Sequence, residues 1–302
     1  MTIPFIKYSK IWLFISGAVA VVSVVFLLMW GLKPGIDFTG GSLLEVTFEK
    51  NRPEHVLVQK TLEDLGQKNA VIQKTRDSSM IMRVGFLTED QHQLVLRELR
   101  AKYAIDNTMR EDRFETIGSA VSKQMRTRAL WAIILVNLGI IIYIAYAFRV
   151  VSRPVASWKY GALAILALVH DVLLVLGVFS LLGHMYGTEV DIPFVVALLT
   201  VLGYSVNDTI VVYDRVRENL LRHSADNFSD TVNNGLNQTL MRSINTTMKT
   251  TLPLFALYFL GGSTINSFVL ALIIGIISGA YSSIFIATPM LVLVEKWQHK
   301  KV

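Results

Sequence analysis

Asp208 lies inside an apolar stretch of the chain that is long enough to cross a lipid bilayer. The run 192–213 carries no other charged residue, and a carboxylate at such a depth is costly unless it is paired, protonated or functional. Arg242 precedes the next apolar stretch, on what should be the same side of the membrane. An acid facing a cation inside a helical bundle is the minimum equipment for coupling ion movement to conformational change. The sequence therefore predicts part of an ion-driven membrane machine.

The charge state of Asp208 is expected to depend on the geometry of the two helices. Burial and the nearby Arg242 act in opposite directions on its protonation, so a small rearrangement would shift the balance. We expect protonation to release the attraction between the two side chains and to let their helices repack. The alternative is a static ion pair that holds the bundle together.

Other polar residues in the apolar runs are secondary candidates for this site. Asp171 and His170 lie near the middle of the run 160–183. A role in a proton relay and a role in structural hydrogen bonding are about equally expected for them. As neighbours they point about 100° apart on a helix and are expected to need different partners. Water binding near the pair, or plain interhelical hydrogen bonding, is expected of Asn207 and Thr246.

Lys249 is the one unexpected charge near the predicted pair. It follows Arg242 by seven residues and shares its helical face. It is expected to snorkel to the membrane surface, to pair with Asp171, or to compete for Asp208. A coupling role for Lys249 would change the simple picture of one acid and one base.

The composition places the chain among membrane proteins. Apolar residues make up 52% of the 302 residues, and the mean hydropathy is +0.47, both above the range of soluble globular domains. There is no cysteine, which excludes disulfides, thiol nucleophiles and thiolate metal sites. The net charge of +6 comes from basic residues beside the apolar runs, which indicates membrane orientation rather than nucleic-acid binding. We predict no metal, no cofactor and no enzymatic activity.

Six membrane spans are expected from charge-free runs of sufficient length. The positions of Lys and Arg in the short loops predict that both termini are cytoplasmic. A cleaved signal peptide is the alternative for the first span, but its apolar run is too long for one. The expected spans are 11–32, 129–148, 160–183, 192–213, a fifth that includes 244–260, and 267–294. The expected division is 1–33 (N-terminus and first span), 34–128 (extracytoplasmic domain) and 129–302 (five spans, with a cytoplasmic loop 214–241 and a cytoplasmic tail).

Residues 34–128 are expected to fold as a small α+β domain. The hydrophobic periodicities predict strands and helices in the order βαββαβ, at 43–48, 53–65, 70–75, 80–86, 89–103 and 113–117. This order is the ferredoxin-like split βαβ arrangement. Gly35, Gly40 and Gly41 precede a strand rather than a helix, so they indicate turn geometry rather than a phosphate loop. His55 and His92 are expected to be solvated surface residues.

Five segments in order resemble one known family. They are Gly-Ile-Asp-Phe-Thr-Gly-Gly at 35–41, Ala-Leu-Val-His-Asp-Val at 167–172, Gly-Tyr-Ser-Val-Asn-Asp-Thr-Ile-Val-Val-Tyr-Asp-Arg at 203–215, Asn-Gln-Thr-Leu-Met-Arg-Ser-Ile-Asn-Thr-Thr at 237–247, and Gly-Ala-Tyr-Ser-Ser-Ile-Phe-Ile-Ala at 279–287. Together they resemble the SecF branch of the SecD/SecF family of protein-export membrane proteins, in the RND (resistance–nodulation–division) superfamily. The likeness extends over nearly the whole chain.

The resemblance implies a helical half-bundle that SecD completes. It further implies a multi-pass protein of the bacterial or archaeal cytoplasmic (inner) membrane that uses the proton-motive force to assist preproteins through the Sec translocon (SecYEG). By motif match, the coupling residues of the family fall on Asp208 and Arg242. Gly35, Asp37, Gly40 and Gly41 fall in the motif that follows the first span. Gly275 and Gly279 form a GxxxG face, for contact with SecD or within the chain.

Three other functions remain open at this point. One is an RND-type ion-coupled permease that moves a small molecule or uses Na⁺ as the coupling ion. Another is an intramembrane aspartyl protease that uses Asp171 or Asp214 beside Asp208, although Arg242 at the same depth disfavours the required pair of carboxylates. The third is a passive assembly subunit that moves no ion.

Overall fold

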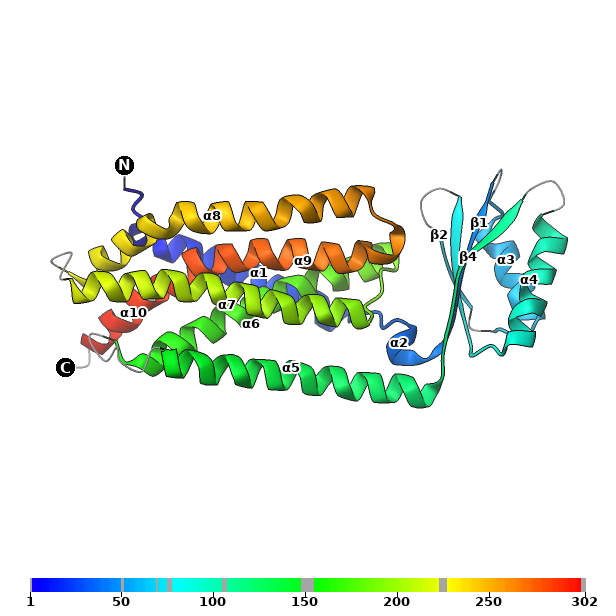
Figure 1. Ribbon diagram of the computed structural model, residues 1–302, viewed down its shortest axis with the longest axis horizontal. Helices are drawn as coiled ribbons and strands as arrows, with labels where there is room; N and C mark the ends of the chain where they lie inside the picture. The colour runs from blue at the N-terminus through cyan, green and yellow to red at the C-terminus, as the bar shows by residue number, and fades with distance from the viewer. Residues whose placement is uncertain are drawn as a thin grey trace. The chain divides into compact units, whose positions relative to one another are not determined.

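A computed structural model describes residues 2–49, 52–68, 70–74, 78–104, 108–147, 155–222 and 227–299. The chain forms two compact units (Figure 1). The helical unit comprises Met1–Leu32, Trp131–Thr188 and Pro193–Val302. The sheet unit comprises Lys33–Leu130 and, from a distant part of the chain, Glu189–Ile192.

Long helices make up the helical unit, and two of them begin in the sheet unit. A short 3₁₀ turn, Ile6–Tyr8, leads into the first helix. The helices are α1 (Ser9–Trp30), α5 (Ser119–Ala147), α6 (Ser157–Tyr186), α7 (Ile192–Leu221), α8 (Phe228–Leu260), α9 (Ser263–Ser282) and α10 (Thr288–His299). A five-residue π-helical turn, η2 (Ser283–Ala287), joins α9 to α10 without a break.

Five helical segments of the described chain are long and apolar enough to cross a membrane. They are Ile6–Trp30, Ser119–Ile144, Trp158–Tyr186, Ile192–Leu221 and Thr264–Gln298. The predicted fifth span falls in α8, which does not meet this criterion because its polar residues lower its hydropathy. The expectation of six spans is therefore not confirmed by hydropathy. The interval 214–241 contains the end of α7 and the first part of α8.

Small residues bring two pairs of helices into close contact, α9 with α7 and α6 with α1. A Cβ added to Gly279 of α9 would lie 2.7 Å from Cβ of Ser205 on α7, and one added to Gly275 would collide with Val201. A Cβ on Gly177 of α6 would lie 2.5 Å from Ser23 on α1. The GxxxG face therefore packs within the chain, against α7, and not on a partner.

The sheet unit has the predicted order of strands and helices. It contains β1 (Gly41–Phe48), α3 (His55–Asp64), β2 (Val71–Lys74), β3 (Ser79–Val84), α4 (Glu89–Tyr103) and β4 (Met109–Ile117), after a single helical turn, α2 (Ile36–Thr39). The four strands form one antiparallel sheet in the order β2-β3-β1-β4. The prediction of a small α+β domain after the first span is confirmed.

Helices α3 and α4 cover one face of this sheet (Figure 1). Alternate residues of each strand point to that face. In β1 these are Leu44, Val46 and Phe48, and in β3 they are Met80, Met82 and Val84. They pack with residues of both helices in a single apolar core. Arg83 lies between two of these core positions and therefore on the opposite face of the sheet.

The prediction for His92 is wrong. Its side chain is buried and stacks on the Phe114 ring with centroids 3.6 Å apart. Its Nε2 lies 2.9 Å from Oε1 of Glu111 on β4. The acidic partner was missed because β4 is non-local in sequence, and the helical period does place His92 near Leu96 and Leu99 of the buried face.

Gly40 precedes β1 and Gly41 begins it, both in backbone conformations that favour glycine. Their φ angles are +75° and +115°. A Cβ on Gly41 would lie 2.7 Å from the carbonyl oxygen of Val84, and a Cβ on Gly40 would lie 3.3 Å from the carbonyl oxygen of Ile117. The two glycines therefore let the start of β1 pass between the ends of β3 and β4, as the turn interpretation predicts.

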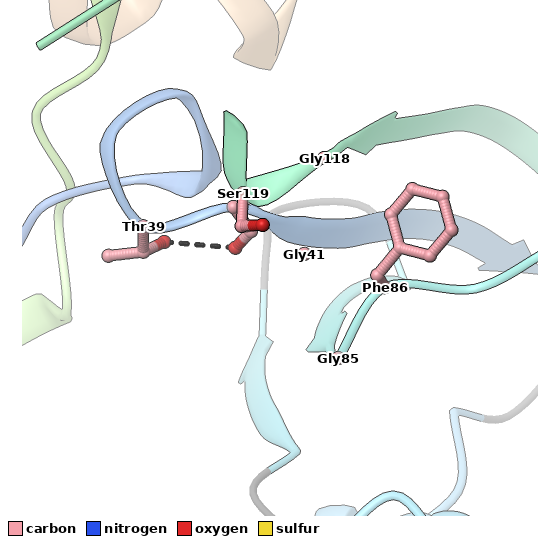
Figure 2. A pocket seen from close by; sticks show the side chains of 7 residues that line it. Thr39, Gly41, Gly85, Phe86, Gly118 and Ser119 are labelled. Atoms are coloured by element: carbon pink, nitrogen blue, oxygen red, sulfur yellow. Dashed lines mark hydrogen bonds between the residues drawn. The ribbon is translucent and has the colours of Figure 1, made fainter. Parts of the chain in front are cut away.

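A pocket lies at this end of the sheet (Figure 2). It is lined largely by glycine backbone together with the exposed Phe86, and Thr39 donates a hydrogen bond to the carbonyl oxygen of Gly40. None of the lining residues carries a titratable side chain. The pocket therefore lacks the groups that acid–base catalysis needs. The lining residues are Thr39, Gly40, Gly41, Gly85, Phe86, Gly118 and Ser119.

We expect Gly41→Ala to destabilise the sheet unit. A positive φ costs a residue with a side chain about 1–3 kcal/mol, and the contact with the Val84 carbonyl adds to this. The measurement is protease resistance of the sheet unit in the purified full-length chain. Gly118→Ala is the matched control, because nothing lies within 4 Å of the Cβ position there. Equal resistance of the two variants would contradict the assigned role of Gly41.

Candidate ion-coupling site

Asp208 is held by α7 against α8 with only half of its carboxylate engaged. The residue is 7% exposed. Its Oδ1 accepts a hydrogen bond of 2.8 Å from the Ser243 hydroxyl of α8. Its Oδ2 is buried and has no hydrogen-bond partner among the described residues. One oxygen of this acid is therefore available for a proton or a new donor without loss of an existing bond.

Arg242 does not form an ion pair with Asp208 in the described part of the structure. It precedes Ser243 on α8, and its side chain is exposed in the isolated chain. Successive helical residues point about 100° apart, so α8 can turn only one of the two toward Asp208. Here that residue is Ser243, and Arg242 stands beside the carboxylate instead of bonding to it.

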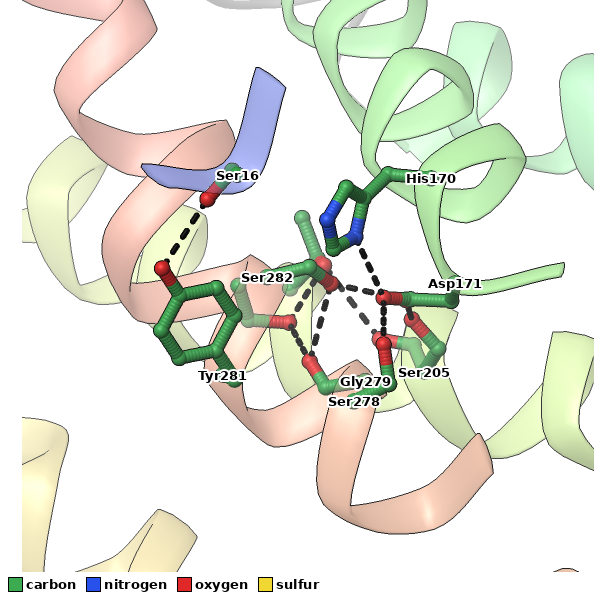
Figure 3. Close-up of polar contacts among 10 residues, drawn as sticks. Ser16, His170, Asp171, Ser205, Ser278, Gly279, Tyr281 and Ser282 are labelled. Carbon is green, nitrogen blue, oxygen red and sulfur yellow. Dashed lines mark hydrogen bonds and ion pairs between the residues drawn. The ribbon is translucent and has the colours of Figure 1, made fainter. Parts of the chain in front are cut away.

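A second acid, Asp171 of α6, lies fully buried in a ring of hydroxyl groups (Figure 3). Ser278 donates to its Oδ1 at 2.6 Å. Ser205 and Ser282 donate to its Oδ2, each at 2.7 Å. We call this set, Asp171 with its three serines, the serine ring. It links α6 to both α7 and α9.

His170 contacts Asp171 directly, but it does not share the serine partners of Asp171 in the described contacts. Nδ1 of His170 lies 3.3 Å from Oδ1 of Asp171. The imidazole also lies near the Tyr281 ring, whose hydroxyl group is 2.9 Å from that of Ser16 on α1 (Figure 3). His170 Nε2 is buried without a partner in the described ranges. The polar contacts around Asp171 thus extend from α6 to α1.

Helix α7 carries a residue of each acidic site. Ser205, which donates to Asp171, precedes Asp208 by three residues on the same helix, so the two lie on neighbouring turns of one face. Thr209 lies 2.7 Å from Ser283 of the π turn, oxygen to oxygen. The serine ring therefore fixes the part of α7 that presents Asp208 to α8.

The remaining candidates lie farther from these bonds. Asn207 and Lys249 are exposed, and no described ion pair joins Lys249 to Asp171 or Asp208. Thr246 is partly buried, and its carbonyl accepts a hydrogen bond from Thr250. The serines were missed because a serine in an apolar run carries little signal by itself. Ser278 and Ser282, spaced four apart, were the available clue.

The geometry does not support a protease. Asp214 is exposed, and the described acceptor bonds of Asp171 go to serines. No second carboxylate is hydrogen-bonded to Asp208 among the described residues. In the same residues no group of three His, Cys, Asp or Glu side chains is placed to hold a metal ion.

The motif after α1 makes its contacts with the segment between α6 and α7. The Gly35 amide donates to the carbonyl of Val190 at 2.8 Å. Asp37 Oδ2 accepts from the amide of Ile192 at 2.7 Å. Gly40 and Gly41 instead shape the start of β1. The four motif residues therefore have structural roles, two at a long-range contact and two in a turn.

Comparison with known proteins places these features in one family. The model of the C-terminal region of the protein-export membrane proteins SecD and SecF matches residues 99–297, and the model of the SecD/SecF GG motif matches residues 26–51. The chain belongs to the SecD/SecF family. The GG motif of this family is thus the segment that contains Gly40 and Gly41.

Full-length relatives lie in the SecF branch of the SecD/SecF family. The chain is 43% identical to the protein translocase subunit SecF of Thermobaculum terrenum, over 99% of this chain and 95% of that protein. It is 36% identical to SecF of Synechocystis sp., over 100% of this chain and 97% of that protein. As a member of this family it is a multi-pass membrane protein and a transport component of Sec-dependent protein export, not an enzyme.

Longer proteins of the same family contain a counterpart of this chain as one part. The protein translocase subunit SecDF of Thermus thermophilus is 39% identical over 90% of this chain, but the match covers 35% of that protein. The crystal structure of SecDF from that organism superposes with a TM-score of 0.84 at 34% identity, over 98% of this chain and 39% of that one. A structure of SecDF in its super-membrane-facing form superposes with a TM-score of 0.66. The SecD/SecF fold is therefore shared by these chains.

Proposed function

We propose that this chain is the SecF half of a SecD–SecF complex in which protons, bound and released at Asp208, assist preproteins through the Sec translocon. The single observation that carries the proposal is the carboxylate itself. It is buried between two helices, with one oxygen bonded to Ser243 and the other without a described partner. A charged side chain inside a membrane has a high free-energy cost, so its presence there supports a functional role.

Helix α8 is proposed as the sixth span. It follows α7 and precedes α9, and in Figure 1 it runs alongside α9 through the helical unit. Its 33 residues extend about 50 Å at the helical rise, enough to cross the bilayer. The polar residues that lower its hydropathy include Ser243, the partner of Asp208. A polar span at this place supports a functional interior rather than a lipid-facing surface.

The proposed orientation puts both termini in the cytoplasm of a bacterial or archaeal cell. Lys and Arg are frequent at the N-terminal end of α1 and at the C-terminal ends of α7 and α10. Residues 187–191, between α6 and α7, contain neither. The sheet unit then lies on the extracytoplasmic side.

SecD is the proposed partner that completes the bundle. Many apolar side chains of α1, α5 and α8 are exposed in the isolated chain, which supports a need for further helices or lipid around them. The Thermus thermophilus protein holds the SecF-like part within one longer SecDF chain. SecYEG and the emerging preprotein are the further proposed partners.

The proposed mechanism uses the free oxygen of Asp208. A proton arriving at Oδ2 removes the carboxylate charge and with it the attraction for Arg242, so that α8 can rotate or slide against α7. The serine ring ties α7 to α6 and α9, so that these three helices move together relative to α8. One charge crossing the membrane supplies about 2.3 kcal/mol per 100 mV, which biases a two-state contact more than tenfold. No covalent bond needs to break.

Reconstitution with SecD and the translocon tests this proposal. Export into vesicles is measured with and without a proton gradient, and again with sodium omitted. The expected result is stimulation that a protonophore removes and that sodium omission leaves unchanged. If stimulation requires sodium, the coupling ion is Na⁺ and not the proton. Stimulation that needs neither ion would leave a passive subunit and overturn the proposal.

A further inference from the structure

The segment Glu189–Ile192 belongs to the sheet unit although it connects two helices of the helical unit. Pro34 and Val190 form an isolated parallel β-bridge. Besides the bond from Gly35, the Val190 amide donates to the Lys33 carbonyl at 2.8 Å. Asp37 binds the amide of Ile192, the first residue of α7. We call the contacts of Glu189–Ile192 with Lys33–Asp37 and with Arg83 the joint.

Arg83 and Glu189 meet in the joint, on the face of the sheet that α3 and α4 leave uncovered. Nε of Arg83 lies 2.7 Å from Oε2 of Glu189, and the two side chains are only 14% and 15% exposed. Gly35 makes room for them, because a Cβ there would lie 3.2 Å from Glu189 Oε2. The Nη1 atom of Arg83 is buried and has no hydrogen-bond partner in the described ranges. The pair is therefore enclosed but incompletely satisfied.

The joint differs from the rest of the sheet unit in how it is held. The apolar core, which binds α3 and α4 to the sheet, includes none of its residues. Its described contacts are one bridge, a few hydrogen bonds and one ion pair. Contacts of this kind separate at a lower free energy than a packed apolar core. The joint can therefore open while the sheet unit stays folded.

We propose that this joint opens and closes during each cycle of export, and so connects the movement of α7 to the sheet unit. The inference rests on the proposed function, because it takes the cycle of α7 and α8 as the source of the movement. Helix α7 begins at the joint and carries Asp208 sixteen residues later, about 24 Å along the helix. Arg83, Glu189 and Asp37 are positioning residues in this scheme and do not bind the coupling ion.

Acid on the outer side favours the closed joint. Burial raises the pKa of Glu189 to about 7 from its ordinary 4.5, with repulsion from Asp191 in the same direction and attraction from Arg83 and Lys33 against it. Two further charges lie near: Arg113, which repels Arg83, and Asp37. An opened joint exposes Glu189 and returns its pKa toward 4.5, so the closed joint binds the proton more tightly. The closed form is therefore favoured at low pH and weakens as the pH rises from 4.5 to 7.

A disulfide across the β-bridge tests whether opening is required. The chain has no cysteine, so Pro34→Cys with Val190→Cys gives a single possible crosslink between bridged neighbours. In the reconstituted complex with SecD we expect the reduced form to support export and the oxidised form to lose most of its stimulation. Reductant should restore it. Export by the oxidised form equal to that of the reduced form would overturn the proposal.

The matched control is a crosslink within the rigid sheet. Thr47 and Ser79 are paired across β1 and β3, so Thr47→Cys with Ser79→Cys places a disulfide in the same unit without bridging the joint. Oxidation of this variant should leave export unchanged. An equal loss in both crosslinked variants would assign the effect to oxidation of the unit and would also overturn the proposal.

A labelling experiment tests the joint without any export. Val190→Cys in the complex is treated with a membrane-impermeant maleimide between pH 5.5 and 8, with rates normalised to Lys60→Cys at an exposed position. We expect labelling to rise by up to about tenfold per pH unit as the pH approaches 7, then to level off. Glu189→Gln should abolish this rise, and Asp112→Asn, at an exposed ion pair, should retain it. A pH-independent rate in the parent would overturn the acid-closed joint.

The two proposals fail in distinguishable ways. In one outcome Asp208→Asn loses export, and the oxidised Pro34→Cys, Val190→Cys variant exports normally. This outcome would retain the proton-coupling proposal and overturn the proposal that the joint must open. Normal export in Asp208→Asn, with the crosslink still inhibitory, would retain the joint and overturn proton coupling at that residue.

Discussion

Asp208→Asn is expected to abolish ion-driven stimulation of export while leaving the protein folded and bound to SecD. Asparagine has the shape of aspartate and can still accept the hydrogen bond from Ser243, but it cannot take up and release a proton at Oδ2. The variant loses the free energy that a proton gains in crossing the membrane, about 2.3 kcal/mol per 100 mV. We therefore expect the stimulation of export by the proton gradient to fall more than tenfold. The measurement is export into vesicles energised by a proton gradient, at matched protein content.

Asp214→Asn is the control for this substitution. It makes the same chemical change on the same helix, six residues later, at an exposed position. Its export should equal that of the parent. Full stimulation in a stably assembled Asp208→Asn complex would contradict coupling through this acid. The same assay separates the role of Ser243, because Ser243→Ala removes a hydrogen bond and leaves the titrating group in place.

The helices and strands were largely predictable because they depend on local patterns. Apolar runs of sufficient length mark α1, α5, α6 and α7, and alternating residues mark β1 and β3. α8 shows where a local rule fails. Its position in the chain indicated a span, but its serines, threonines and charged residues lower its hydropathy below that of a membrane helix. A helix that contributes polar residues to an interior site is harder to find by hydropathy.

The acidic residues of the candidate site could be predicted from the sequence, but the residues that hydrogen-bond to them could not. A buried carboxylate stands out in an apolar run, so Asp208 and Asp171 are visible from the sequence. Ser243, adjacent to the expected Arg242, turned out to be the bonded residue, because helical phase decides which of two neighbours faces α7. The joint was not predictable at all. Asp37 and Ile192 are 155 residues apart in the chain, and no periodicity connects them.

The comparison of the two acids explains why they are given different roles. Asp171 accepts bonds from three hydroxyl groups and contacts His170, whereas Asp208 accepts one and has an oxygen without a described partner. A change at Asp171 must break several bonds between three helices, and a change at Asp208 breaks none at Oδ2. The serine ring is therefore suited to a fixed support, and Asp208 to a switch. A relay role for Asp171 with His170 stays a prediction of the sequence.

Asp171→Ala is expected to be strongly destabilising. It leaves the hydroxyl groups of the serine ring without their acceptor in a fully buried place. Each buried donor without a partner costs about 1–3 kcal/mol, so the loss is a large part of the stability of a typical domain. The expected result is low accumulation in membranes and a lower unfolding temperature of the purified chain in detergent. The unfolding temperature, followed by circular dichroism, is the measurement.

Removing the donors as well distinguishes support from proton relay. Replacing both partners of a buried hydrogen bond by apolar groups costs much less than removing one. The quadruple variant, Asp171→Ala with alanine at Ser205, Ser278 and Ser282, should therefore recover much of the lost unfolding temperature. If Asp171 is a support, export should recover together with stability. Recovery of stability without export would instead make Asp171 part of the ion path, since the restored fold would lack only its titrating group.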